Sequence, residues 1–278
     1  MMKKQDAKLL LHRAFGKARP EVRLDGKGYT ATVEENLIDG VRLTDFEDDL
    51  RQGNGNELCE VAQGRIKFCA AHSSSALAVN CFASFKRHLA DLSLLGENGF
   101  HAMQFETRCP SGLRGTPPNL DLVIENKNIV IGIESKFTEH LDARSQNKHG
   151  QEFADSYMTN QQASWDAKWV AEMRRIKNDR PYKYLDAAQL VKHAFGLKNT
   201  FGDDCVLLYV FWQPADAAHQ NFINHREEIA CLSRRVDGAT PSFTAMSYSE
   251  LWRAWQDNAA PWLSEHLAHL RARYEVSA

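Results

Sequence analysis

Two consecutive apolar segments, joined by a two-residue turn, constrain the fold of this chain more than any other feature. Residues 120–125 and 128–137 are rich in Leu, Ile and Val, and Asn126-Lys127 separates them. Apolar runs of this length that contain many β-branched residues are typical of β-strands, and a tight turn between two of them favours pairing. The sequence therefore predicts an antiparallel hairpin with largely buried strands.

Side chains alternate between the two faces of this hairpin. In the register that sets Glu125 opposite Asn128, the charged residues Asp121, Glu134 and Lys136 share one face. The other face is then apolar and consists of Leu120, Leu122, Ile124, Ile129, Ile131, Ile133 and Phe137. A register shift of two residues preserves this division, whereas a shift of one residue destroys it.

Two carboxylates and one ammonium at the end of an apolar hairpin are costly to bury without partners. A divalent cation would relieve the repulsion between Asp121 and Glu134, and oxygen ligands suit Mg²⁺. The backbone carbonyl of Ser135 is a further candidate ligand. Lys136 would lie near a metal-bound water and near the charge that develops on a phosphate. This set of groups suits the hydrolysis of a phosphodiester bond.

The segments around the hairpin indicate an α/β fold. Before it we expect helices over residues 56–68 and 75–95 and a strand over 100–106. After it we expect helices over 161–177 and 182–195, a strand over 205–212, and one or two helices over 249–274. The glycine at position 196 is expected to end the second of these helices. This order predicts a mixed central sheet flanked by helices.

The residues of the hairpin resemble the PD-(D/E)XK nuclease superfamily, whose core is an αβββαβ unit. The match consists of Asp121, a strand turn, and then Glu134-Ser135-Lys136. Within the superfamily the chain is most similar to restriction-endonuclease-like proteins of bacteria and phage. The resemblance implies that Asp121 and Glu134 bind metal and that Lys136 serves the attacking water. The chain departs from the family pattern at one point, because Asn119 and Leu120 separate Pro118 from the aspartate.

The resemblance also implies the domain organisation and an additional acidic residue. Residues 1–278 would form a single nuclease-like domain, with an N-terminal extension (1–55), a core (56–212) and a C-terminal helical extension (213–278). Members of the superfamily often add an acid from an earlier element. We favour Glu106, at the end of a strand, over Glu57 or Glu60, and a solvated surface carboxylate is the alternative for each.

A second group of polar residues lies in the segment 182–195. Gln189 precedes Lys192 and His193 by three and four residues, so all three can share one helical face. Similar nucleases of the exonuclease branch carry Gln-x-x-x-Tyr in this helix, whereas this chain has Gln-x-x-x-His. Gln189 and Lys192 are therefore candidates for contacts with the metal shell or with phosphate. An ordinary exposed helix face is the alternative.

The overall charge limits how the chain can bind DNA. With 34 basic and 36 acidic residues the formal net charge is −2, so any binding must use a local basic surface. Basic residues gather after Lys136, at Arg144, Lys148, His149, Arg174, Arg175, Lys177, Arg180 and Lys183. Solvated helix faces would account for them equally well.

Other features bear on localisation. The longest apolar run, residues 205–212, is too short to span a bilayer, so we expect no membrane partner. No export signal is visible, and the six cysteines form no Cys-x-x-Cys pair. These features lead us to expect reduced thiols and a cytoplasmic protein.

The leading hypothesis is an Mg²⁺-dependent deoxyribonuclease, a restriction-type or defence-associated endonuclease. The alternative is a non-catalytic nucleic-acid-binding or assembly protein on the same fold, because a fold does not fix a function. A homodimer is expected by analogy with similar enzymes that pair two active sites. The recognition sequence, the choice between DNA and RNA, and the choice between endo- and exonucleolytic cutting stay open.

Overall fold

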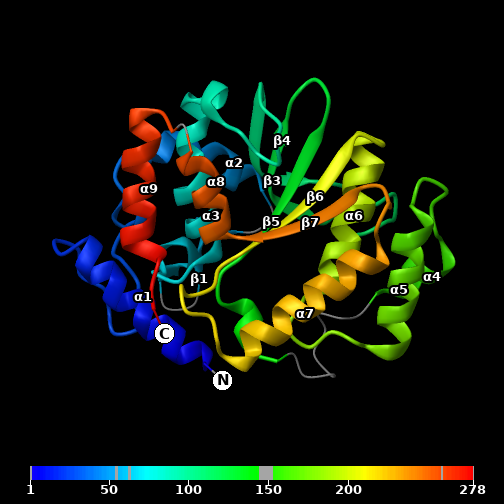
Figure 1. Cartoon of the computed structure of the whole chain (residues 1–278), viewed down its shortest axis with the longest axis horizontal. Coiled ribbons are helices and arrows are strands. Elements are labelled where there is room, and N and C mark those ends of the chain that lie inside the picture. Colours follow the sequence, from blue (N-terminus) through cyan, green and yellow to red (C-terminus); the bar gives the residue numbers. More distant parts are fainter. Residues whose placement is uncertain (1, 54–55, 62–63, 144–152, 258, 278) are drawn as a thin grey trace.

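A mixed five-stranded sheet runs through the middle of the molecule, in the order β3-β4-β5-β6-β7 (Figure 1). The computed structural model describes residues 2–53, 56–61, 64–143, 153–257 and 259–277. The strands are β3 (Ala102–Arg108), β4 (Asn119–Glu125), β5 (Val130–Lys136), β6 (Cys205–Phe211) and β7 (Ser242–Ser247). β3, β4 and β5 pair antiparallel, and β6 and β7 continue the sheet in parallel to β5. The predicted mixed sheet is thus confirmed.

Helices cover both faces of this sheet, and a separate apolar core lies under each layer (Figure 1). On one face lie α1 (Lys4–Ala18), α2 (Glu47–Gln52), α3 (Ser74–Phe82), α8 (Tyr248–Gln256) and α9 (Pro261–Tyr274). On the other lie α4 (Asp155–Thr159), α5 (Ala167–Asp179), α6 (Ala187–Phe201) and most of α7 (Gln220–Arg235). Trp165 and Trp169 are buried in the second core. The order α3-β3-β4-β5-α6-β6 matches the predicted αβββαβ core of a restriction-endonuclease-like fold.

The hairpin of β4 and β5 has the predicted strands in a register shifted by two residues. Glu125 lies opposite Val130, and Val123 lies opposite Gly132. The Asn126 side chain accounts for the wider turn, because its Oδ1 accepts hydrogen bonds from the backbone N–H groups of Asn128 and Ile129. Since the shift is even, the predicted alternation of faces is preserved for most residues.

Leu120 is the exception to this alternation. It was expected on the face opposite Asp121, but it belongs to the core under α6. Gly132 explains the difference, because a Cβ at that position would come within 2.7 Å of Leu120 Cδ1 and 3.0 Å of Leu197 Cδ1. The space that Gly132 leaves open is therefore filled by these two leucines.

Upstream of the sheet, the structure corrects two predicted helices. Residues 56–68 do not form a helix; they contain the short strands β1 (Glu60–Val61) and β2 (Arg65–Ile66), which pair antiparallel. The helix expected over 75–95 begins one residue earlier, with Ser73 as its N-cap, and ends at Phe82. Short 3₁₀ turns follow over Ala83–Arg87 and Leu89–Asp91. Helical periodicity does not distinguish these tighter turns from a continuous α-helix.

Downstream, α6 continues to Phe201, so the prediction that Gly196 ends it is wrong. Gly196 serves close packing instead, because a Cβ there would overlap the backbone carbonyl oxygen of Cys109. The C-terminal segment was expected to be helical, but it also supplies the edge strand β7. In the part of the chain that the structure describes, no helix has both the length and the apolar character needed to cross a lipid bilayer. All six cysteines are free thiols.

Candidate active site

The strands β4 and β5 separate at the point where the predicted site residues lie. The last pair of their ladder is Leu122 with Ile133. Beyond this pair, the backbone N–H of Ser135, two residues after Ile133, donates to Oδ2 of Asp121 at 2.6 Å. A carboxylate thus takes the place that a backbone carbonyl occupies elsewhere in the ladder. The Ser135 hydroxyl contacts the Tyr248 hydroxyl of α8 at 2.6 Å, and the role of the Ser135 carbonyl as a metal ligand stays a prediction.

Glu134 is enclosed between two basic side chains. Its Oε1 lies 2.5 Å from Nζ of Lys136, and its Oε2 lies 3.1 Å from Nδ1 of His193. The Glu134 side chain is 2 % exposed, so burial alone would raise its pKa; Lys136 and His193 outweigh burial and lower the pKa to about 2. Burial likewise opposes charge on Lys136, but Glu134 and Asp121 raise its pKa. Both residues are therefore charged at neutral pH.

Asp121 faces a cleft of about 480 Å³ between the sheet and α6. The wall of this acidic cleft includes the carboxylates Glu57, Glu106, Asp121 and Asp186 and, from α6, Gln189, Lys192 and His193. Burial is the main cause that raises the pKa of Asp121 well above its usual value, and the negative charge of Glu134 adds to it. Glu134 and Lys136 do not line the cleft, so His193 connects the cleft wall with the buried ion pair.

Glu106 lies beside Asp121 on the neighbouring strand, between the paired residues Phe105 and Thr107. Its backbone has the left-handed conformation, with φ of 50°, which is uncommon for a residue other than glycine. Burial, together with the nearby charge of Glu57, raises the pKa of Glu106 to about 7. Of the three acids proposed to complete the site, Glu106 and Glu57 line the acidic cleft, whereas Glu60 lines a different pocket.

The cleft-lining residues of α6 follow directly after the capped N-terminus of this helix. The Asp186 side chain accepts a hydrogen bond from the backbone N–H of Gln189 at 3.1 Å and thereby caps α6. Gln189, Lys192 and His193 all line the cleft, as their spacing predicted. The contact of His193 with Glu134 was missed. The only signal for it is the i, i+4 spacing from Gln189, which places the ring on the cleft side but does not name its partner.

Several of the basic residues proposed to contact DNA have partners within the chain. Arg175 pairs with the buried Glu172, and Lys177 donates to the Phe153 carbonyl and to Asp155. The Lys192 ammonium lies 5.3 Å from the centroid of the Phe153 ring, at the cleft. Three further candidates, Arg144, Lys148 and His149, lie outside the described residues.

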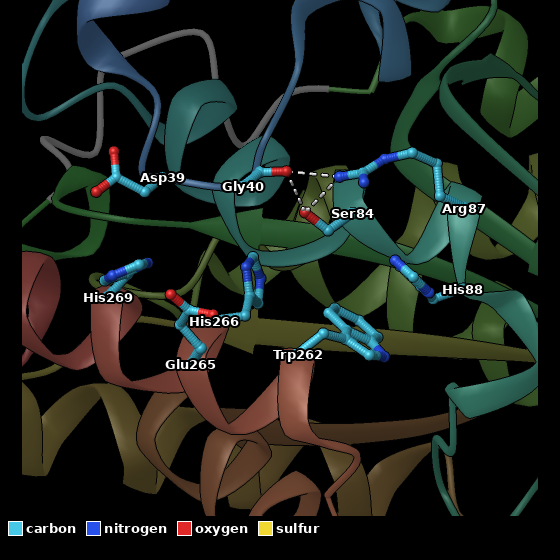
Figure 2. A pocket seen from close by; sticks show the side chains of 9 residues that line it. All are labelled: Asp39, Gly40, Ser84, Arg87, His88, Trp262, Glu265, His266 and His269. Atoms are coloured by element: carbon cyan, nitrogen blue, oxygen red, sulfur yellow. Dashed lines mark hydrogen bonds between the residues drawn. The ribbon is translucent and has the colours of Figure 1, made fainter.

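A second pocket lies on the opposite layer, between α9 and the 3₁₀ turn that follows α3 (Figure 2). It contains His266 and His269, which lie three residues apart on α9. His266 is buried with Nε2 3.2 Å from the Cys81 carbonyl, and the neighbouring His88 ring stacks on Trp262. The Arg87 guanidinium contacts the Gly40 carbonyl. His266, His88 and Arg87 are thus engaged in contacts within the chain, which makes this pocket a weaker candidate for an active site than the acidic cleft.

The acidic cleft and the ion pair behind it offer hard oxygen donors. Within the described residues, no three His, Cys, Asp or Glu side chains are already arranged around one point as metal ligands. Both oxygens of Glu134 are buried without a well-aligned hydrogen bond, and so is Oδ1 of Asn119 at the cleft. Crowded carboxylates with raised pKa values are the groups that a hard divalent cation would stabilise. The chemical type of these oxygen donors therefore fits a hard divalent cation.

Comparison with known proteins places the chain in a family. No curated protein and no solved structure matches it. The family model described as "Restriction Endonuclease associating with ARP" matches residues 4–275, which is almost the whole of the 278-residue sequence. That match agrees with the restriction-endonuclease-like fold. The chain therefore belongs to the family of restriction endonucleases associating with ARP.

Proposed function

We propose that this protein is an Mg²⁺-dependent deoxyribonuclease, a restriction-type or defence-associated endonuclease that hydrolyses phosphodiester bonds in DNA. The family supports a nuclease-like or defence role. The observation that carries the proposal is the gathering of Asp121, Glu134 and Lys136 where β4 and β5 separate, beside the acidic cleft. A hairpin that served only the fold would not require two acids and an amine at this point.

In this proposal the metal ligands are Asp121 and Glu134, with the Ser135 carbonyl as a further oxygen donor. A bound Mg²⁺ supplies Lewis-acid polarisation of the phosphoryl group and neutralises its charge. Glu106 lies next to Asp121 and is the favoured additional acid of the site. Gln189 lines the cleft from α6, where it would contact the metal shell or the phosphate.

Lys136 has the role of a charged donor in this mechanism. Since Glu134 and Asp121 raise its pKa against the effect of burial, it keeps its proton at neutral pH. A protonated amine cannot accept a proton from water. In the metal-free protein Lys136 is therefore a donor, and in this proposal it orients the attacking water and stabilises negative charge on the phosphate.

The test is the nicking of supercoiled plasmid DNA in Mg²⁺ and in chelator. We compare the wild type with Asp121→Asn, Glu134→Gln and Lys136→Met. Glu125→Gln and Lys127→Met, on the same hairpin but away from the site, are the matched controls. We expect Mg²⁺-dependent nicking by the wild type and both controls, and a loss of about 100-fold or more in the three site variants.

Two results would overturn the assignment. Equal cleavage by all variants would exclude the proposed roles of the three residues. An absence of cleavage on any DNA, together with retained DNA binding, would favour the alternative of a non-catalytic nucleic-acid-binding protein.

The same proposal names DNA, ARP and a second copy of the chain as partners. DNA is the substrate, and the family description names an association with ARP, so we propose that the chain acts together with that component. A homodimer would let two active sites cut both strands. Light scattering of the purified chain, alone and with a DNA duplex, measures whether it pairs.

A further inference from the structure

We infer that His193 is a positioning residue that holds Glu134 in the orientation needed for metal binding. The consequence for the metal rests on the proposed function, whereas the contact between the two side chains does not. The contact joins a helix to the sheet, because His193 lies on α6 and Glu134 on β5. None of the roles proposed above for Asp121, Lys136 or Gln189 involves it.

The geometry of the pair determines which ring nitrogen of His193 carries the proton that faces Glu134. Nδ1 of His193 lies 3.1 Å from Oε2 of Glu134, and the two side chains are 3 % and 2 % exposed. An ionised carboxylate only accepts hydrogen bonds, so Nδ1 must carry the proton that faces it. In the metal-free protein neither Nδ1 of His193 nor Oε2 of Glu134 has a well-aligned hydrogen bond, so the pair is a close electrostatic contact that water does not reach.

Lys136 alone does not fix the orientation of Glu134. Its ammonium is 2.5 Å from the other carboxylate oxygen, but it also interacts with Asp121 and Glu139. A lysine presents a point charge on a flexible stem, so it neutralises Glu134 without setting its angle. A planar ring on a rigid helix instead restricts the positions that the Glu134 carboxylate can take.

The helix that carries the ring has little freedom to move. One turn after His193, Gly196 packs directly against the Cys109 carbonyl, leaving no room for a Cβ. Asp186 caps the start of α6. His193 also lines the acidic cleft with Asp121, whereas Glu134 does not. The ring is thus the only cleft-lining group, among those described, that the structure shows in contact with Glu134.

The test measures Mn²⁺ binding to the full chain by calorimetry in three His193 variants. His193→Asn keeps an N–H donor at the δ position, His193→Gln moves it to the ε position, and His193→Leu removes it. His101→Leu, at an exposed histidine at the start of β3, is the matched control. We expect the dissociation constant for Mn²⁺ to rise about 10- to 100-fold in the Leu and Gln variants. It should stay within about threefold of the wild type in the Asn and His101 variants.

The same experiment separates failure of this inference from failure of the proposed function. If the wild type binds Mn²⁺ and Asp121→Asn does not, the metal site stands. Unchanged binding by His193→Leu, or no rescue by His193→Asn, then overturns the positioning role. If the wild type does not bind Mn²⁺, the ¹⁵N NMR spectrum of the His193 ring in the metal-free protein still tests the contact with Glu134. A proton on Nδ1 supports the contact, and a proton on Nε2 alone overturns it.

Discussion

At the scale of single residues, Glu106 has the clearest dependence on pH. Its pKa is raised to about 7, first by burial and then by the charge of Glu57. A carboxyl group whose pKa is higher in the folded than in the unfolded state binds its proton more tightly when folded. The free energy of unfolding therefore falls as the pH rises from about 4.5 to about 7, and the full cost is present above that range.

The corresponding prediction concerns Glu106→Gln. Removing the ionisable group should stabilise the metal-free protein by about 2–3 kcal/mol more at pH 8.5 than at pH 5. Urea denaturation at both pH values measures this difference, with Glu125→Gln on β4 as the control. A stability difference between Glu106→Gln and the wild type that does not change with pH would contradict the raised pKa.

The Glu134–Lys136 pair allows a second prediction at this scale. Removing either charge leaves its buried partner with only its remaining contacts, His193 for Glu134 and Asp121 and Glu139 for Lys136, at a cost of up to about 3–5 kcal/mol. The double variant Glu134→Gln/Lys136→Met leaves neither charge, so its loss of stability should be at least about 1 kcal/mol smaller than the sum of the single losses. Urea denaturation of all four proteins at pH 7 completes the cycle. Additive losses would show that the two charges do not stabilise each other.

The sequence predicted the faces of Asp121, Glu134 and Lys136, because side-chain alternation survives an even shift of register. It could not predict the Glu134–His193 contact. The two residues lie 59 positions apart, and their approach depends on how closely α6 packs on β5. That distance is set by Gly132 and Gly196, whose missing side chains make room for Leu197 and the Cys109 carbonyl. Local patterns do not report such packing.

At the scale of elements, α6 connects the cleft with the core. Gly196 lies in the interior of this helix, where alanine is usually more stable by about 1 kcal/mol. Here the Cys109 carbonyl occupies the place of the Cβ. Helix propensity and packing thus make opposite predictions for a substitution at this position, and packing should dominate.

We therefore expect Gly196→Ala to lower the melting temperature and to weaken Mn²⁺ binding, since α6 must move and carries His193 with it. Gly16→Ala is the matched control, because Gly16 lies in α1 with open space around its Cβ position. That control should raise stability by about 0.5–1 kcal/mol. The melting temperatures of both variants, measured by calorimetry, show whether packing or helix propensity dominates at position 196. A stabilised Gly196→Ala would mean that α6 and the Cys109 loop are not tightly packed.

The elements that sequence reasoning missed have weak patterns for physical reasons. β7 is an edge strand of mixed polarity, Ser-Phe-Thr-Ala-Met-Ser, and lacks the apolar run that revealed β6. Residues 56–68 contain a two-residue strand pair with Gly64 at φ of 70°, too short to produce a periodic signal. The long buried strands were predicted because each is apolar over most of its length.

At the scale of the whole molecule, the N- and C-terminal segments are joined by buried polar contacts. Asn80 of α3 donates to the Asn36 carbonyl and to the Tyr274 hydroxyl of α9, and it accepts from the backbone N–H of Ile38. Arg273 stacks over the Phe15 ring of α1 at 4.1 Å. That residues 1–278 form a single domain stays a prediction, and these contacts make it testable.

Asn80→Ala would leave three buried polar groups without their partner, at a cost of about 3 kcal/mol or more. If the chain is one cooperative unit, the variant should unfold in a single transition shifted to lower urea, whether followed by tryptophan fluorescence or by circular dichroism. The exposed Asn128 supplies the control Asn128→Ala. Two separate transitions, only one of them shifted, would show that the terminal segments and the sheet unfold independently.

The proposed function depends on Asp121 and Glu134 binding one divalent cation together, at the ends of β4 and β5 where these strands separate. The most direct measurement is the anomalous difference density of a crystal soaked in Mn²⁺. We expect a peak within ligand distance of carboxylate oxygens of both residues. A peak at Asp121 that excludes Glu134, or no peak at the acidic cleft, would contradict it.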